Sequence, residues 1–156
     1  MSIGYNWMGY GIQNKITQYA LLSGGILVSI IGVGHIFMPE FGYEKNIPAS
    51  MDTEISNHFY YLGTYAICSF LLSLGIISIY LSRKNYRDIS LTICSIWALL
   101  WTSRFILEII YPVKLKLFFL TNPTQVLTPF IGLIALIYIS GAATGLISYF
   151  KNPRLD

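Results

Sequence analysis

The sequence is poor in charge. Lys, Arg, Asp and Glu make up 11% of its 156 residues, whereas hydrophobic residues make up 54%. An average soluble domain carries about 25% charged residues, so this chain has too few polar groups to cover a surface exposed to water. The composition argues against a soluble enzyme, a disordered tail and a nucleic-acid binder. The Lys and Arg residues are scattered, which is typical of residues that flank membrane spans.

Several motifs are missing as well. The chain has only two cysteines, Cys68 and Cys94, which is too few for a disulfide scaffold. It contains no GxSxG motif, no Gly-rich phosphate loop and no CxxC pair. We expect no cleavable signal peptide, because the first apolar run is longer than the hydrophobic region of such a peptide. Nothing in the sequence therefore marks a catalytic nucleophile or a secreted protein.

Long hydrophobic runs are the main positive feature. Four of them, at 16–38, 59–82, 89–111 and 126–149, are long enough for helices that cross a bilayer. They predict one all-α domain over residues 1–156, an integral membrane four-helix bundle. Lys and Arg are in excess on the side of the bundle that holds both termini, which predicts that the termini are cytoplasmic. The residues on that side are Lys15, Arg83, Lys84, Arg87, Lys151 and Arg154, against Lys45, Lys114 and Lys116 on the other.

Small residues mark the helix faces expected to pack. Gly141 and Gly145 form a GxxxG motif in the fourth run, and Gly32 and Gly34 lie in the first. Small residues at this spacing let two helices approach closely in lipid. We expect packing within the bundle, with a contact to another subunit as the alternative.

Two charged residues interrupt the third run. Arg104 and Glu108 are four residues apart, so they share a helical face and are within reach of each other, and Trp101 extends that face. Ionisable groups inside a membrane span are costly, and they are candidates for function. The pair is either a structural ion pair, an anchor for an anionic or polar headgroup, or a pair for proton transfer.

The threading of the helices predicts a cluster at their non-cytoplasmic ends. His35 lies near the end of the first run, and His58 and Tyr61 lie at the start of the second, so all three are expected at the level of Arg104 and Glu108. Three ligands fit such residues. The first is haem, which the two histidines can bind. The second is a metal ion, which can be bound by His35, His58 and Glu54. The third is the headgroup of a quinone or a lipid, which His35 and Arg104 can hold. Otherwise the histidines are simply interfacial.

The end of the first run carries a resemblance. The segment Gly32-Val33-Gly34-His35-Ile36-Phe37-Met38-Pro39-Glu40-Phe41 resembles the end of the first helix in DoxX/DoxD-like membrane proteins, which have four helices with short loops. His35 and Pro39 match positions of that family. The resemblance implies a bacterial inner membrane protein, and some members of the family are linked to quinone or to thiol redox systems. Arg104 and Glu108 depart from the family pattern.

These features favour a non-catalytic subunit or interaction partner of a larger membrane complex. The expected partners are the lipid bilayer and other membrane subunits or further copies of the chain, and no nucleic acid. The alternative is a redox membrane protein that binds quinone, lipid, haem or metal at the non-cytoplasmic ends of the first three spans.

Overall fold

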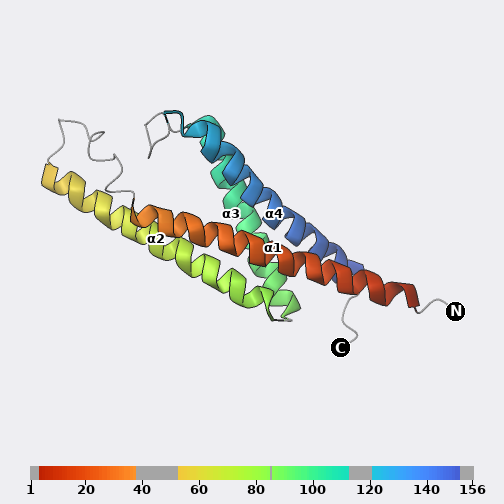
Figure 1. Ribbon diagram of the computed structural model, residues 1–156. Coiled ribbons are helices and arrows are strands. Elements are labelled where there is room, and N and C mark those ends of the chain that lie inside the picture. The colour runs from red at the N-terminus through yellow and green to blue at the C-terminus, as the bar shows by residue number, and fades with distance from the viewer. Residues whose placement is uncertain (1–3, 38–52, 85, 113–120, 152–156) are drawn as a thin grey trace.

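The computed structural model describes residues 4–37, 53–84, 86–112 and 121–151. Within these residues the chain forms four α-helices and no strands (Figure 1). They are α1 (Gly4–Ile36), α2 (Thr53–Ser82), α3 (Arg87–Ile110) and α4 (Thr124–Lys151).

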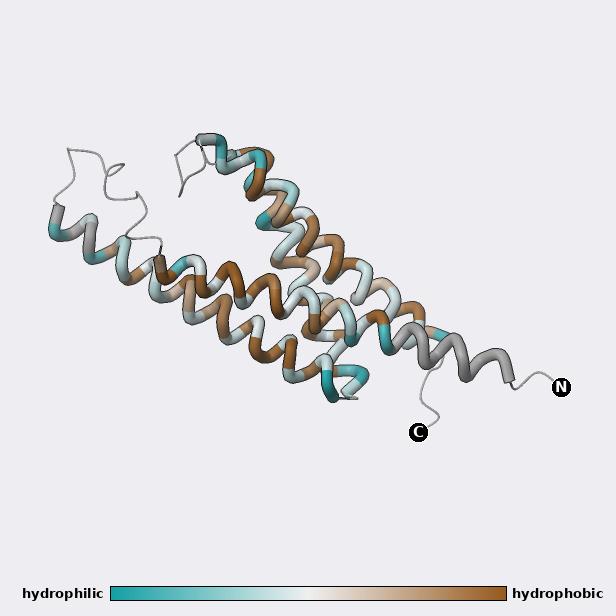
Figure 2. Tube along the Cα trace, viewed as in Figure 1, coloured by the Kyte–Doolittle hydropathy of each residue, from teal (hydrophilic) through white to brown (hydrophobic). Residues whose placement is uncertain are grey.

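Each helix contains a segment that is long and apolar enough to cross a bilayer. These segments are Lys15–Ile36, His58–Ser82, Arg87–Ile110 and Thr124–Lys151. Many large apolar side chains point outward, and Leu99 on α3 is 75% exposed. Figure 2 shows hydrophobic residues along all four helices and hydrophilic ones near the helix ends. A helix satisfies its backbone hydrogen bonds internally, as lipid requires. By length and composition, the chain is a multi-pass membrane protein.

The helices are longer than the apolar runs at two places. The helix α1 begins at Gly4 rather than near residue 16, and α2 begins at Thr53 rather than near residue 59. The expected bounds followed hydropathy, which marks where the apolar residues begin. The backbone hydrogen bonds of a helix do not depend on apolar side chains, so the helix can begin earlier in the chain. The starts of α3 and α4 lie within two residues of the expected positions.

The helices form two antiparallel hairpins, α1 with α2 and α3 with α4. The hairpins meet mainly where α1 packs against α4, and α2 and α3 touch only slightly. Figure 1 shows that the hairpins are close at the end that holds Lys15, Ser82, Arg87 and Lys151, which we call the closed end. They diverge towards Ile36, Ile110 and Thr124, which we call the open end.

Glycines bring α1 very close to α2. A Cβ atom on Gly25 would lie 2.9 Å from the carbonyl oxygen of Gly75, and a Cβ atom on Gly75 would lie 2.8 Å from the carbonyl oxygen of Gly25. Gly32 also faces α2, where its Cβ would lie 3.1 Å from Leu72. The two backbones therefore touch directly, as small residues permit in membrane helices.

The GxxxG motif of α4 faces the inside of this chain. A Cβ atom on Gly141 would lie 2.5 Å from Ala20 of α1, and one on Gly145 would lie 2.8 Å from Leu91 of α3. These two glycines thus pack α4 against α1 and α3. Gly34 has nothing within 4 Å of its Cβ position, so it takes no part in this packing.

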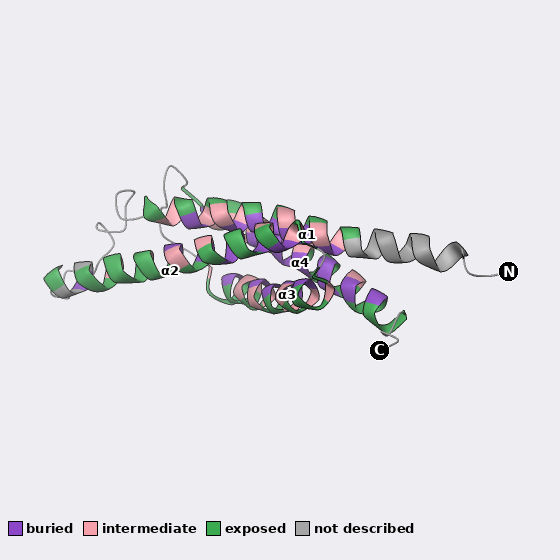
Figure 3. Cartoon of the chain, turned by 90° about the horizontal axis from the view of Figure 1, so that it is seen from below, coloured by how far each residue is buried: buried purple, intermediate pink, exposed green. Residues whose placement is uncertain are grey.

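Burial along α1 follows the divergence of the hairpins. Leu21 and Val28 are buried, whereas Ile31 and His35, the next residues on the same face, are only partly buried. Figure 3 shows the buried residues gathered where α1, α3 and α4 meet, while the first half of α2 is mostly exposed. The packed core therefore ends before the open end is reached.

Candidate functional site

The Arg104–Glu108 pair lies on α3 in the half nearer the open end. Arg104 Nη2 is 2.6 Å from Glu108 Oε2, one helical turn away. The Glu108 side chain is completely buried, whereas that of Arg104 is 42% exposed. A carboxylate inside an apolar segment needs a close positive charge or hydrogen-bond donors. Arg104 supplies that charge, and its exposed part faces outward from the pair.

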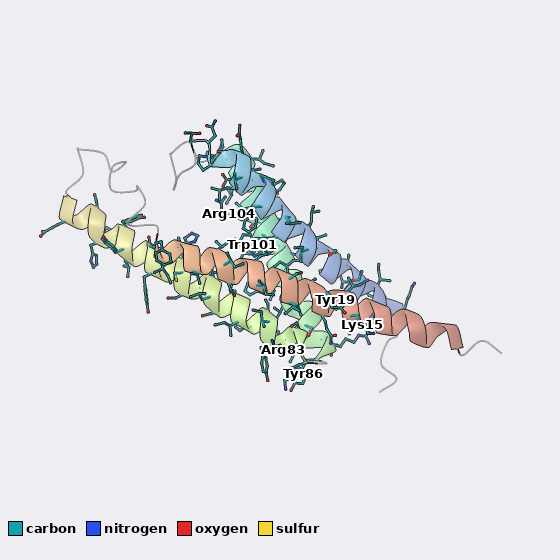
Figure 4. All side chains as sticks on the ribbon, in the orientation of Figure 1. Lys15, Tyr19, Arg83, Tyr86, Trp101 and Arg104 are labelled. Atoms are coloured by element: carbon teal, nitrogen blue, oxygen red, sulfur yellow. The ribbon has the colours of Figure 1, made fainter. Side chains whose placement is uncertain are left out.

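Trp101 lies one turn before Arg104 on the same side of α3. The residue is 4% exposed, and its Nε1 has no hydrogen-bond partner within the described residues. Figure 4 labels Trp101 and Arg104 on neighbouring turns of α3, in the part where the two hairpins diverge. We call the region between the diverging hairpins the opening. A buried indole N–H and an exposed guanidinium are both donors, so this part of α3 can hold an acceptor oxygen.

The register of α3 and α4 sets what faces Glu108. A Cβ atom on Gly132 would lie 2.9 Å from the ring of Phe105, so these two residues are at the same level. Because α3 and α4 are antiparallel, the turn before Gly132 is level with the turn after Phe105. Glu108 is therefore level with Thr128, whose Oγ1 is buried and has no hydrogen-bond partner in the described part of the chain. Pro129, inside α4, adds to the local polarity because it leaves the Gln125 carbonyl without its helical donor.

His35 belongs to the other hairpin, on the face of α1 that packs against α4 nearer the closed end. Its Nδ1 lies 2.8 Å from the carbonyl oxygen of Ile31. A carbonyl oxygen only accepts hydrogen bonds, so Nδ1 carries the proton, and in the neutral ring Nε2 is an acceptor. The two diverging hairpins thus carry an acceptor on α1 and the Arg104 donors on α3.

His58 lies at a different level from His35. The contacts of Gly25 with Gly75 and of Gly32 with Leu72 fix the register of α1 and α2 and place His35 about level with Ser69. His58 is then about three turns, or about 16 Å, further along α2, beyond the end of α1. The sequence predicts that His35 and His58 lie at the same level of the bundle. The structure places them apart, because α2 extends past α1 at the open end.

The other residues expected at this cluster lie near His58 on α2. Tyr61 and Glu54 are exposed on the same part of α2, and Tyr61 makes an edge contact with Tyr60. Within the described residues, no group of three or more His, Cys, Asp and Glu side chains is placed to hold a metal ion. The structure brings together Trp101, Arg104 and Glu108 on α3, places His35 on the other hairpin, and leaves His58, Tyr61 and Glu54 further along α2.

A second polar group lies in the centre of the core, where sequence reasoning did not place one. Trp97 Nε1 donates to Ser78 Oγ at 2.9 Å, and the Tyr138 hydroxyl lies 3.4 Å from the same oxygen. These side chains come from α2, α3 and α4, and Ser78 is fully buried. The sequence held no clear signal for this group, because Ser78 is one of several serines in α2.

Replacing Ser78 with alanine should destabilise the protein by about 2 kcal/mol, because the buried Trp97 N–H and Tyr138 hydroxyl lose their shared acceptor. Thermal unfolding of the purified protein in mild detergent measures this. Ser73→Ala is the matched control, since the Ser73 hydroxyl is exposed and bonds only the Ser69 carbonyl of its own helix. We expect its effect to stay within about 0.5 kcal/mol. Equal losses of stability in the Ser78→Ala and Ser73→Ala variants would refute a special role for Ser78.

No protein-family model matches the chain, and comparison with curated proteins and with solved structures gives no match either. The function of the chain has to be inferred from the arrangement of its own side chains.

Proposed function

We propose that this chain is a non-catalytic subunit of a membrane complex, and that a transmembrane helix of another subunit packs into the opening between its two hairpins. The observation that carries the proposal is Arg104, a charged residue that is 42% exposed within an apolar membrane segment. A guanidinium at such a position is costly unless it meets a polar group or extends to the bilayer surface.

The surroundings of Arg104 indicate the chemistry of the partner. Glu108 neutralises one side of the guanidinium, so the remaining donors suit a single acceptor, such as a carbonyl, amide or carboxylate oxygen on the incoming helix. His35 offers an acceptor on the other side of the opening. Ile31, one turn before His35 on α1, is partly buried and adds apolar surface next to that acceptor. A mostly apolar helix with one or two polar side chains fits this combination.

Photo-crosslinking in native membranes tests the proposal. A photoreactive residue at Ile31, on the opening, should crosslink to one discrete protein, whereas the same residue at the lipid-facing Leu99 should give lipid adducts. The double variant Arg104→Met/Glu108→Leu removes the guanidinium without leaving the buried Glu108 carboxylate unpaired, and it should reduce the protein crosslink by about tenfold or more, because a charged contact of the interface is lost. Lys151→Gln removes one charge at the closed end and should leave the yield unchanged. Lipid adducts alone from position 31 would refute the proposal.

A second candidate function is the binding of a small amphiphilic molecule, such as a quinone or a lipid, in the same opening. It is favoured by the acceptor on His35 of α1 and the donors on Arg104 of α3, which the two diverging hairpins carry. The resemblance of the 32–41 segment to DoxX/DoxD-like proteins, some of which are linked to quinone, also favours this candidate. Residues 38–41 lie outside the described part of the chain. Mass spectrometry and an absorption spectrum of the purified protein distinguish it, because a stoichiometric bound quinone would favour ligand binding over the subunit role.

A further inference from the structure

Positive charge gathers at the closed end of the bundle. Within the described residues, every Lys and Arg except Arg104 lies there, and Asp88 is the one carboxylate at that end. These residues come from α1, from the turn after α2, and from α3 and α4. We call them the basic rim: Lys15, Arg83, Lys84, Arg87 and Lys151. Most of the rim is exposed, and Arg87 is partly buried. The rim therefore carries a strong net positive charge.

Hydrogen bonds between helices hold parts of the rim in place. Gln18 Nε2 donates to the Lys84 carbonyl at 3.4 Å, which brings the turn of α1 after Lys15 beside the end of α2. Arg87 Nη2 donates to the Ser148 carbonyl at 2.7 Å and links α3 to α4. Figure 4 shows Lys15, Arg83 and Tyr86 at this same end. The cations are thus gathered by the fold and not only by their order in the sequence.

A small recess lies beside Arg87. It is lined by Thr17, Arg87, Leu91, Gly145 and Ser148, and its volume of about 10 Å³ has room for about one oxygen atom or water molecule. Ser90, one turn along α3 from Arg87, is 2% exposed, and its Oγ has no hydrogen-bond partner among the described residues. The recess and Ser90 add polar groups at the inner edge of the rim.

Exposed aromatic side chains surround the rim, which is typical of residues at the surface of a bilayer. Tyr19, Tyr80, Tyr86 and Tyr149 are exposed at the closed end, and tyrosine favours the headgroup region of membranes. The Lys84 ammonium lies 5.5 Å from the centre of the Tyr80 ring, and the Arg87 guanidinium lies 5.2 Å from that of Tyr149. Cations beside interfacial tyrosines and exposed apolar helix surfaces are typical of residues that meet lipid phosphates.

We propose that the basic rim is a binding site for the phosphate group of an anionic phospholipid. Several cations from neighbouring helices match a phosphate with a net negative charge better than they match a zwitterionic headgroup. The exposed apolar side chains beside the rim favour a lipid over free phosphate, since only a lipid contacts both. This site is separate from the opening at Arg104 and does not depend on the proposed subunit role.

Native mass spectrometry of the delipidated protein tests this site, with phosphatidylglycerol, phosphatidylcholine and inorganic phosphate as probes. The wild type should retain phosphatidylglycerol in preference to phosphatidylcholine. The double variant Arg83→Gln/Lys84→Gln should bind phosphatidylglycerol about 25-fold more weakly, at about fivefold for each cation removed near a membrane surface. Both side chains are exposed, so the variant should fold normally, which its unfolding temperature checks.

Three outcomes would overturn the proposal. The first is equal retention of the two phospholipids by the wild type. The second is unchanged binding of phosphatidylglycerol by a folded double variant. The third is displacement of phosphatidylglycerol by an equal concentration of inorganic phosphate, which would identify free phosphate as the ligand.

Discussion

Replacing Gly25 with leucine should lower the unfolding temperature by about 10 °C, corresponding to about 3 kcal/mol for a chain of this size. The Cβ position of Gly25 is 2.9 Å from the Gly75 carbonyl oxygen and 2.9 Å from Ser78 Cβ. A larger side chain there meets backbone, which cannot rotate away as a flexible side chain can. The helices α1 and α2 must therefore separate, and the contacts of both helices along this seam weaken with them.

Gly34→Leu is the control for this prediction. Gly34 is on the same helix, but nothing lies within 4 Å of its Cβ position. We expect the unfolding temperature of the Gly34→Leu variant to change little, because an exposed leucine on a membrane helix contacts lipid tails and displaces no part of the protein. Circular dichroism in detergent during heating measures both variants, and size-exclusion chromatography checks that they are monodisperse. A similar loss in the two variants would mean that leucine harms α1 regardless of contact, which would contradict the close packing at Gly25.

The number and type of helices could be predicted from the sequence because lipid leaves few alternatives. A chain with four apolar runs of bilayer length has to satisfy its backbone hydrogen bonds within each run, and helices do so. The ends of α1 and α2 were less predictable, since Gly4 and Thr53 lie in polar segments where hydropathy gives no boundary. The GxxxG motif indicated a packing face of α4, but not that Gly141 would meet both Ala20 and Cys94.

The candidate site was predictable only within a single helix. The spacing of Arg104 and Glu108 fixes their separation, since both are carried by the same rigid helix. The relation of His35 to His58 depends on how far α2 slides along α1, which glycine contacts between the helices decide. Sequence distance across the intervening loop does not encode that offset. Ser78 shows the same limit, because its partners Trp97 and Tyr138 come from two other helices.

The second large effect is expected at the ion pair of α3. Replacing Arg104 with methionine removes the guanidinium 2.6 Å from a completely buried carboxylate, and it should destabilise the protein by about 3 kcal/mol. Glu108→Leu should cost less, about 1 kcal/mol, because the Arg104 side chain is 42% exposed and can turn towards the bilayer surface. The cost of losing one partner is thus set by the burial of the other.

The double variant Arg104→Met/Glu108→Leu decides whether the two residues act as a pair. With both charges removed, no buried charge is left without its partner, and apolar side chains of similar size can fill the space. We expect the double variant to lie within about 1 kcal/mol of the wild type, well short of the summed losses of the single variants. Unfolding free energies in detergent for all four proteins complete the cycle. Additive losses would show that the Arg104–Glu108 contact contributes no coupling energy, and the site would then need another explanation for its buried carboxylate.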